Sequence, residues 1–150
     1  MWKLNPFFCS AETLKEIADK LFDEREYEEA NKYYKMLIRK YPESEIALLE
    51  VGKAQYSRGI KIFFEKGERD EIIKYANKSI KAFRKFLKLY PESDSAPEVQ
   101  LYLIRNYYFL LKDYKQASAE SKKLKRDYPE SESAKLADLY IVTAKNQGGE

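Results

Sequence analysis

The sequence predicts an all-α fold built from repeated helical hairpins. A heptapeptide that begins Tyr-Pro-Glu-Ser and ends in Ala occurs three times, at 41–47, 90–96 and 128–134. The stretches between these copies carry apolar residues at helical spacing, and the 150 residues include only five Gly and five Pro. Each Pro ends one helix and each Ser followed by an acid starts another, so three such breaks indicate an internal repeat.

Composition predicts one folded domain over 1–150 without catalytic chemistry. Hydrophobic residues make up 44% of the chain and charged residues 35%, which is typical of a folded domain with its own core. The formal net charge of +3 is too balanced to predict nucleic acid as a partner. Because the chain has no His, it cannot carry a His-based triad or an imidazole zinc site. We therefore predict no enzymatic activity, no cofactor and no metal, and no apolar run is long enough for a transmembrane segment.

The first unit covers about 11–44 and is predicted to form two helices. Ser10 is the expected N-cap of the first helix, which runs from Ala11 to about Glu24. The second helix is expected over 27–40. Pro42 then ends it, because proline disfavours helical geometry in the residue before it.

The second unit covers about 45–93 and contains an insertion. Pro91 follows Pro42 by 49 residues, and the added residues fall between the two helices of the unit. We expect the first helix to extend over 45–65. After a turn, its partner is expected to begin at residue 70 or 71 and to end at Leu89.

The third unit covers about 94–131 and is followed by a single helix at 132–146. Ser95 and Glu98 match a capping box at the start of the unit, and Asp113 matches the cap of its second helix. A tetrapeptide of the first helix recurs 38 residues later, in the final helix. The final helix is therefore expected to be a half-repeat that caps the array.

The first unit resembles the 34-residue tetratricopeptide repeat. Seven of its residues stand at the apolar and small positions of that repeat: Leu14, Ile17, Ala18, Leu21, Ala30, Tyr34 and Leu37. Small residues are needed where the two helices cross closely, and Pro42 stands at the terminating position. The resemblance implies a right-handed α-solenoid of three helical hairpins with a C-terminal capping helix.

The longer units resemble one branch of that superfamily. Long repeats closed by Tyr-Pro-x-Ser and a following Ala are similar to the tetratricopeptide domains of the TolA-binding protein and of the BamD-type outer-membrane assembly lipoproteins. One repeat of the BamD type also carries an insertion before its second helix. The branch implies a non-enzymatic scaffold of the bacterial cell envelope that holds partner proteins, with a role in outer-membrane protein assembly. It implies the periplasm or the inner face of the outer membrane where an upstream signal exists; otherwise the protein is expected in the cytoplasm.

In such a solenoid the first helices line a concave groove that binds a peptide or a helix of the partner. Projecting the tetratricopeptide pattern onto the chain places eight candidate partner-binding residues there: Phe22, Leu49, Lys53, Tyr56, Tyr102, Asn106, Phe109 and Tyr140. Aromatic side chains are enriched at protein interfaces, and Asn106 is expected to hydrogen-bond a peptide backbone. The alternative is that the rings bury one another. A clamp for a C-terminal carboxylate is not expected, because Asp19 is acidic where that clamp needs Asn.

Two further features leave alternatives open. Five lysines share one side of the second unit's second helix: Lys74, Lys78, Lys81, Lys85 and Lys88. They could contact an acidic partner or anionic lipid, or they could be an ordinary solvated face. The apolar segment 60–64 could instead support self-assembly into a homo-oligomer, and a cytoplasmic adaptor is the other alternative function.

The first ten residues resemble the end of a lipoprotein signal that stops at Cys9. Only eight residues precede Cys9, whereas the apolar core of a signal alone takes about 7–15 residues. Phe8 also stands where a small residue is needed. We therefore expect a loose apolar N-terminus that packs on the first helix; the alternative is a true start further upstream.

Overall fold

The computed structural model describes residues 5–148, and across these residues it contains helices and no strand. In chain order the elements are η1 (Pro6–Phe8), α1 (Ala11–Asp23), α2 (Tyr27–Lys40), α3 (Glu45–Phe64), α4 (Arg69–Leu89), α5 (Ala96–Arg105), η2 (Asn106–Leu110), α6 (Tyr114–Asp127) and α7 (Glu132–Asn146). η1 is a 3-10 turn and η2 is a π-helical turn. The predicted all-α class is confirmed, and each predicted helix is present within a few residues of its expected bounds.

The chain divides into two compact units, Met1–Glu50 and Val51–Glu150. The division falls inside α3, so unit 1 holds α1, α2 and the first residues of α3. Unit 2 holds the rest of α3 and the helices from α4 to α7. The prediction of a single domain over 1–150 stays a prediction.

Unit 1 is the hairpin of α1 and α2 with the beginning of α3 packed on its core. Ala18 and Ala30 are 0% and 1% exposed, as expected for small residues where two helices cross closely. Leu14 and Leu37 are also fully buried and form one cluster with Ala47. The predicted N-cap is confirmed, because the hydroxyl of Ser10 accepts a hydrogen bond from the amide of Thr13 at 3.2 Å.

The described residues 5–10 pack on the first helix, as predicted, because Cys9 shares a core cluster with Ala11 and Leu14 of α1, and they are also bonded to the end of α2. Cys9 is only 5% exposed and belongs to the unit 1 core cluster. Its carbonyl accepts hydrogen bonds from the Tyr41 hydroxyl at 2.7 Å and from the Lys40 ammonium at 3.1 Å. The Cys9 side chain is therefore part of the core, and its Sγ atom lies 3.7 Å from the Asn5 carbonyl oxygen.

The repeated heptapeptide starts helices through its Ser and its final Ala. In the first and third copies, Ser44 and Ser131 accept a hydrogen bond from the amide three residues later, both at 3.1 Å, and donate to the carbonyl three residues earlier. The Ala of every copy is buried: Ala47, Ala96 and Ala134. The Ser therefore closes the turn and caps the next helix, while the small Ala lets that helix pack closely.

The Tyr of the same heptapeptide ends helices and ties repeats together. Tyr41, Tyr90 and Tyr128 adopt nearly identical backbone angles, with φ of -128°, -129° and -135°. The amide of each donates to the carbonyl four residues before it. The Tyr128 hydroxyl also donates to the Pro91 carbonyl at 2.9 Å, so one break is bound to the preceding one.

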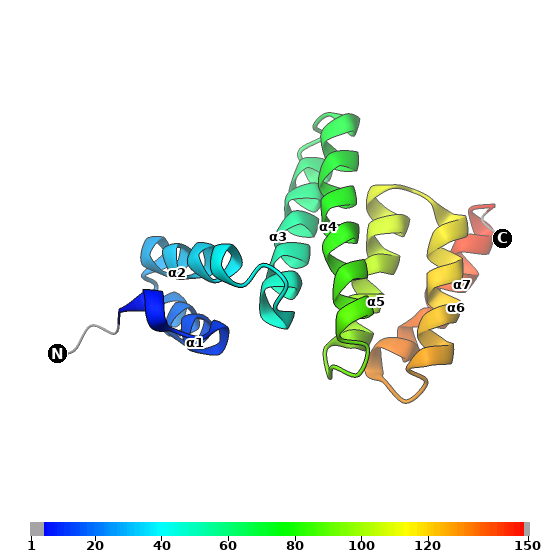
Figure 1. The fold of residues 1–150 in the computed structure, drawn as a ribbon. Helices are drawn as coiled ribbons and strands as arrows, with labels where there is room; N and C mark the ends of the chain where they lie inside the picture. The colour runs from blue at the N-terminus through cyan, green and yellow to red at the C-terminus, as the bar shows by residue number, and fades with distance from the viewer. Residues whose placement is uncertain (1–4, 149–150) are drawn as a thin grey trace. The chain divides into compact units, whose positions relative to one another are not determined.

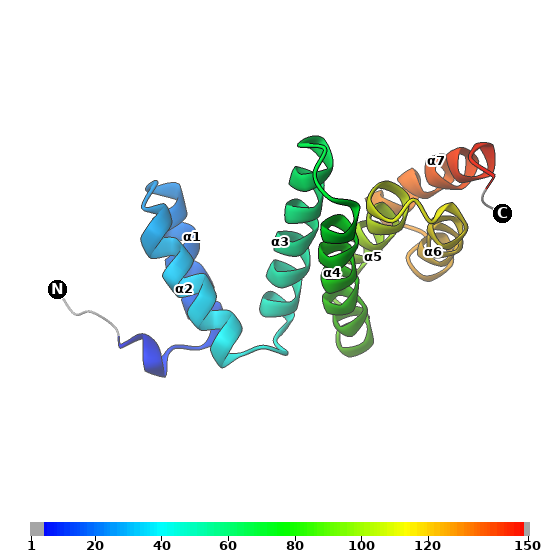
Figure 2. The same cartoon turned by 90° about the horizontal axis from the view of Figure 1, so that it is seen from above.

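Unit 2 is a row of helices in which each one packs against the next (Figure 1). α5 lies between α4 and α6, and α7 contacts both α5 and α6; Figure 2 shows the same succession from above. The fully buried side chains include Phe83 and Phe86 from α4, Leu103 and Ile104 from α5, and Leu124 from α6. The core is therefore continuous across these three helices.

A glycine allows α3 and α4 to approach closely. A Cβ atom added at Gly52 would lie 2.3 Å from the ring of Phe83, so only glycine fits beneath that ring. The hydroxyl of Ser79 donates to the Gly52 carbonyl at 2.8 Å, and the side-chain amide of Asn106 donates to the Ser79 hydroxyl at 2.9 Å. This buried polar ladder joins α3, α4 and η2.

A buried carboxylate joins α4, α5 and α6. Glu120 accepts hydrogen bonds from the Arg84 guanidinium at 2.8 Å and from the Gln100 amide at 2.6 Å. Burial, the largest single influence, acts to raise the pKa of Glu120. The hydrogen bonds from Gln100, Arg84 and Gln116 outweigh burial, so the pKa of Glu120 lies below its ordinary value.

One local prediction for the third unit is wrong. Ser95 has helical backbone angles and its side chain makes no capping hydrogen bond, so the capping box with Glu98 does not form. The first helix also widens into η2, where the amide of Leu111 donates to the Asn106 carbonyl five residues before it. By contrast, Asp113 caps α6 as predicted, because its carboxylate accepts from the Gln116 amide at 3.0 Å.

Replacing Gly52 by Ala should destabilise the protein, although Gly to Ala inside a helix ordinarily stabilises it by about 1 kcal/mol. The added methyl would collide with the buried Phe83 ring, and overpacking a core typically costs about 1–3 kcal/mol. We expect a net loss of up to about 2 kcal/mol in the free energy of unfolding, measured by urea titration. The penalty should shrink in a Phe83→Leu background, and a Gly52→Ala variant more stable than the wild type would contradict the close approach.

Candidate functional site

The eight predicted groove residues fall into both units. Phe22 and Leu49 belong to unit 1, and the other six belong to unit 2. Phe22 is 55% exposed and its ring meets the edge of Tyr27, with the ring centres 5.1 Å apart. Leu49 is half-buried. A single groove that includes both units stays a prediction.

Asp19, near Phe22 in unit 1, is paired within its own hairpin. Asp19 accepts hydrogen bonds from the Lys15 ammonium and the Tyr34 hydroxyl, so the cation of this cluster already has an anionic partner. Burial, the largest single influence on the pKa of Asp19, acts to raise it. The two hydrogen bonds outweigh burial, and the pKa of Asp19 lies below its ordinary value.

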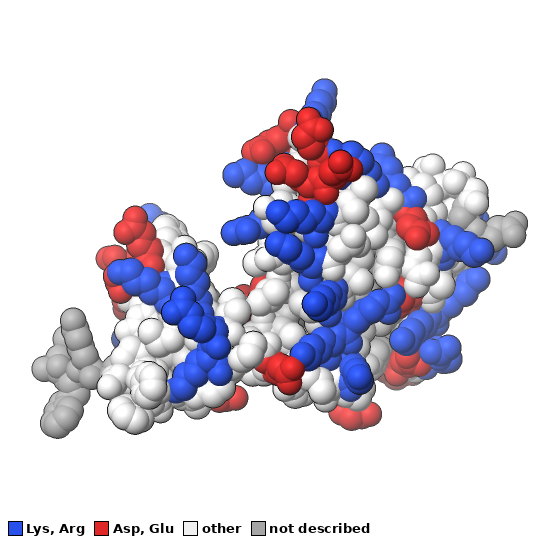
Figure 3. All heavy atoms as spheres, turned by 45° about the horizontal axis from the view of Figure 1, so that its top comes forward, with Lys and Arg blue, Asp and Glu red and all other residues white. Residues whose placement is uncertain are grey.

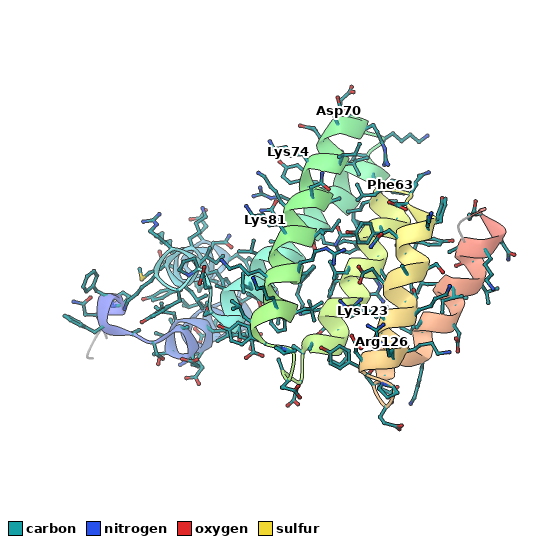
Figure 4. The ribbon with its side chains drawn as sticks, turned by 45° about the vertical axis from the view of Figure 1, so that its right-hand side comes forward. Phe63, Asp70, Lys74, Lys81, Lys123 and Arg126 are labelled. Carbon is teal, nitrogen blue, oxygen red and sulfur yellow. The ribbon has the colours of Figure 1, made fainter. Side chains whose placement is uncertain are left out.

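The aromatic part of the site is centred on Tyr102 in α5. Its ring stacks on buried Phe83, with the ring centres 5.3 Å apart and the planes 24° from parallel. Tyr56 of α3 meets the same ring edge-on, also at 5.3 Å. Two cations lie over Tyr102: the Lys53 ammonium at 5.9 Å and the Arg105 guanidinium at 5.7 Å from the ring centre. Figure 4 shows the side chains of unit 2, from which these residues come.

A second group of rings continues toward α7. Tyr108 meets Phe109, Tyr114 and Tyr140 edge-on, at ring-centre distances of 5.0, 5.1 and 5.5 Å. Phe109 remains 39% exposed, whereas Tyr140 is 9% exposed. We name the set Tyr56, Tyr102, Arg105, Phe109 and Tyr140, contributed by α3, α5, η2 and α7, the tyrosine face.

Two of the predicted contact residues are inaccessible in this structure. Asn106 is fully buried, and its side-chain amide donates to the Ser79 hydroxyl and to the Tyr102 carbonyl. It cannot reach the backbone of a bound peptide, so that expected role is wrong. Tyr140 presents little of its ring to solvent. The alternative that the rings bury one another therefore holds for part of the set, while Tyr56, Tyr102 and Phe109 keep accessible surface.

The surroundings of Tyr56 keep its hydroxyl protonated. Burial raises the pKa of Tyr56 to about 12. The positive charge of Arg105 acts in the opposite direction and lowers the pKa of Tyr56, but burial is the larger influence. Tyr56 is therefore a neutral hydrogen-bonding group over the whole physiological pH range.

Arg105 is a candidate binding residue that the groove prediction did not include. It is half-buried, and its Nε atom donates a long hydrogen bond of 3.4 Å to the Tyr140 hydroxyl. No carboxylate in the described part of the chain pairs with it, whereas its neighbour Lys53 lies 3.4 Å from the Glu98 carboxylate. The signal in the sequence was an arginine at a position where the repeat usually has Gly or Ala. A partly desolvated guanidinium between two tyrosines can bind a carboxylate.

Other sites are absent or unrelated to this face. Within residues 5–148, no cluster of Cys, Asp or Glu side chains could hold a metal ion, and no helix is long and apolar enough to cross a membrane. A pocket of about 530 Å³ lies in unit 1 and is lined by Asn5, Pro6, Phe7, Met36, Arg39 and Lys40.

Comparison with known families identifies the α1–α2 hairpin. Residues 12–44 match the family model of the tetratricopeptide repeat. This match supports a tetratricopeptide repeat protein. The all-helical architecture agrees with the α-solenoid predicted for such repeats, and tetratricopeptide repeats are typically non-catalytic protein-binding scaffolds. No curated protein matches the chain.

Proposed function

We propose that this tetratricopeptide repeat protein is a non-enzymatic scaffold that binds an acidic segment of a partner protein on the tyrosine face of unit 2. The observation that carries the proposal is Arg105, a half-buried cation without a carboxylate partner among residues 5–148. A carboxylate from outside would give this guanidinium a charge-assisted hydrogen bond.

The rings around Arg105 supply the rest of such a site. Tyr102 is held in place by its stacking on Phe83, so little side-chain entropy is lost when a partner covers it. Phe109 offers an exposed apolar surface beside the cation. Rigid aromatic anchors next to an Arg are typical of the residues that dominate binding energy. The expected ligand is therefore a segment with an Asp or Glu next to an apolar residue.

We also propose that the protein works in the bacterial cell envelope, where it would hold partners during outer-membrane protein assembly. The support is the resemblance of its long repeats and their Tyr-Pro-x-Ser breaks to envelope tetratricopeptide domains, together with the extended α3–α4 hairpin. Fractionation of native cells should find the protein with the periplasm or the outer membrane. Recovery from the cytoplasm alone would instead favour a cytoplasmic adaptor.

Replacing Arg105 by Gln should weaken binding of acidic peptides on the order of 10- to 100-fold, because hydrogen bonds to charged groups contribute about 1.5–3 kcal/mol. Random peptides displayed on phage would be selected on the immobilised wild-type protein, and affinities of the selected peptides would be measured by calorimetry. Phe109→Ala should also weaken binding, whereas Tyr102 is unsuitable for the test because its ring supports the core.

Arg39→Gln, which alters an exposed arginine of unit 1, is the matched control and should bind normally. A selection without enrichment of acidic residues, or equal binding by the wild type and Arg105→Gln, would count against the tyrosine face as the site.

Self-assembly is the second candidate function, and the outer face of α7 favours it. Terminal helices of repeat arrays usually carry a polar outer face. Here Leu136, Leu139 and Val142 are 41%, 60% and 56% exposed. Leu136 stands three positions before Leu139, and Val142 stands three positions after it. An antiparallel pair of α7 helices centred at Leu139 would therefore place Leu136 of one copy against Val142 of the other. The same pairing would bring Glu132 near Lys145 of the second copy.

Cysteine cross-linking tests this pairing at the proposed symmetry axis. In a Cys9→Ala background, Leu139→Cys should form a disulfide-linked dimer under mild oxidation, because each Cys would meet its own copy. Lys145→Cys, on the flank of the same helix, should cross-link far less. Equal cross-linking at both positions, or a monomer at every concentration in sedimentation, would rule the pairing out.

A further inference from the structure

Basic side chains gather on one surface of unit 2, formed by α4 and α6. Figure 3 shows Lys and Arg concentrated over these helices, and Figure 4 labels Lys74 and Lys81 on α4 and Lys123 and Arg126 on α6. We name this surface the basic face. Its cations are Lys74, Lys78, Lys81, Arg84, Lys85 and Lys88 from α4, and Lys122, Lys123 and Arg126 from α6.

The charge pattern of α4 conflicts with ordinary helix stability. Between Glu71 and Glu92 the chain has six cations and no acid, and at about 100° per residue the six cations fall within an arc of about 120°. Like charges three and four residues apart, such as Lys74 and Lys78, destabilise a helix. In α2, by contrast, Glu29 lies within ion-pair distance of Lys32. A pattern that weakens its own helix is expected where it serves binding.

Both arginines of the basic face are paired with carboxylates, whereas several of its lysines have no such partner within residues 5–148. Arg84 pairs with buried Glu120 at 2.8 Å, and Arg126 pairs with Asp127 at 2.9 Å. Four lysines have no hydrogen-bond or ion-pair partner within residues 5–148: Lys81, Lys88, Lys122 and Lys123. The ammonium groups of Lys74 and Lys78 lie over the Tyr75 ring, at 5.6 and 5.7 Å from its centre.

A cleft links the two helices in the middle of the face. It has a volume of about 210 Å³ and is lined by Arg84, Leu87 and Lys88 from α4 and by Lys123 from α6. Two of its four lining residues, Lys88 and Lys123, are lysines that no carboxylate within residues 5–148 pairs with, so the cleft attracts a small anionic group. Because both helices contribute, the basic face is one continuous surface and not two separate stripes.

The shape and the residue types of the face fit an extended anionic surface. From Lys74 to Lys88 the lysines cover about 21 Å along α4, at a rise of about 1.5 Å per residue. Lysine ammonium groups are flexible, hydrated point charges without a fixed hydrogen-bonding geometry, whereas arginine forks give geometric recognition. The aromatic rings that could stack on nucleic-acid bases are covered, Tyr75 by Lys74 and Lys78 and Tyr107 by Arg84.

We propose that the basic face docks the protein on an anionic lipid bilayer, with lipid phosphate groups against the lysines and in the Arg84–Lys123 cleft. Lysines that share one surface are attracted by the negative potential of such a membrane, and this attraction does not require a groove that is complementary in shape to the ligand. The proposal is independent of the tyrosine face, which comes from α3, α5, η2 and α7.

Vesicle co-sedimentation of the full chain tests the proposal. The probes are vesicles of phosphatidylcholine alone and of phosphatidylcholine mixed with phosphatidylglycerol. We expect binding to the anionic vesicles only, and loss of that binding as salt is raised. The triple variant Lys81→Gln, Lys88→Gln, Lys123→Gln should bind on the order of 100-fold more weakly, because each lysine near an anionic surface contributes to the attraction.

A charge-matched control separates the face from net charge. The triple variant Lys20→Gln, Lys35→Gln, Lys145→Gln removes three exposed lysines elsewhere, so both triple variants lower the formal net charge from +3 to 0. The control should bind anionic vesicles like the wild type. Equal weakening of both triple variants would overturn the proposal, as would absence of wild-type binding at low salt. Duplex DNA and polyglutamate are added as competitors. If either displaces the protein from vesicles at a lower concentration of negative charge than the lipid supplies, the lipid proposal is overturned and the basic face is assigned to that class of polyanion.

Discussion

The hydrogen-bonded break between repeats is the constraint on which the rest of the structure depends. Tyr128 ends α6 and its hydroxyl holds the Pro91 carbonyl of the preceding break, while Ser131 closes the same turn and caps α7. Tyr41 acts similarly on the Cys9 carbonyl in unit 1. The Tyr128 bond ties the break before α7 to the break before α5, and the Tyr41 bond ties the segment before α1 to the end of α2. The register of the helices, and therefore which side chains share a face, follows from these few contacts.

Once the register is set, close packing inside unit 2 decides which residues remain accessible. Gly52 brings α3 against Phe83, and Phe83 in turn supports the Tyr102 ring. Asn106 fills the space beside Ser79 and completes the buried ladder. The same contacts that hold α3 and α4 together thus remove Asn106 from the surface and hold Tyr102 rigid. A rigid ring beside an unpaired arginine follows from the way this core is packed.

The sequence was sufficient for the helices and insufficient for the site. Prolines, caps and apolar spacing are local signals, so α2 and α7 have the bounds predicted for them. The groove projection assumed a regular helix through the third unit, but η2 is a π-helical turn, and a wide turn changes the phase of the residues that follow. The burial of Asn106 and Tyr140 depends on residues of other helices and could not be read from spacing. The contribution of Lys123 to the basic face likewise required the packing of α6 beside α4 and α5.

The helices of unit 2 contribute different side-chain types to the tyrosine face and to the basic face. α3, α5 and α7 supply tyrosines and one unpaired guanidinium, whereas α4 and α6 supply lysines. In the basic face Arg84 is neutralised by Glu120, so the strongest geometric binder there is already used inside the fold. Beside the tyrosine face the reverse holds, because Lys53 lies near Glu98, whereas no carboxylate within residues 5–148 pairs with Arg105. If both proposals hold, a partner segment and an anionic surface would not compete for the same side chains.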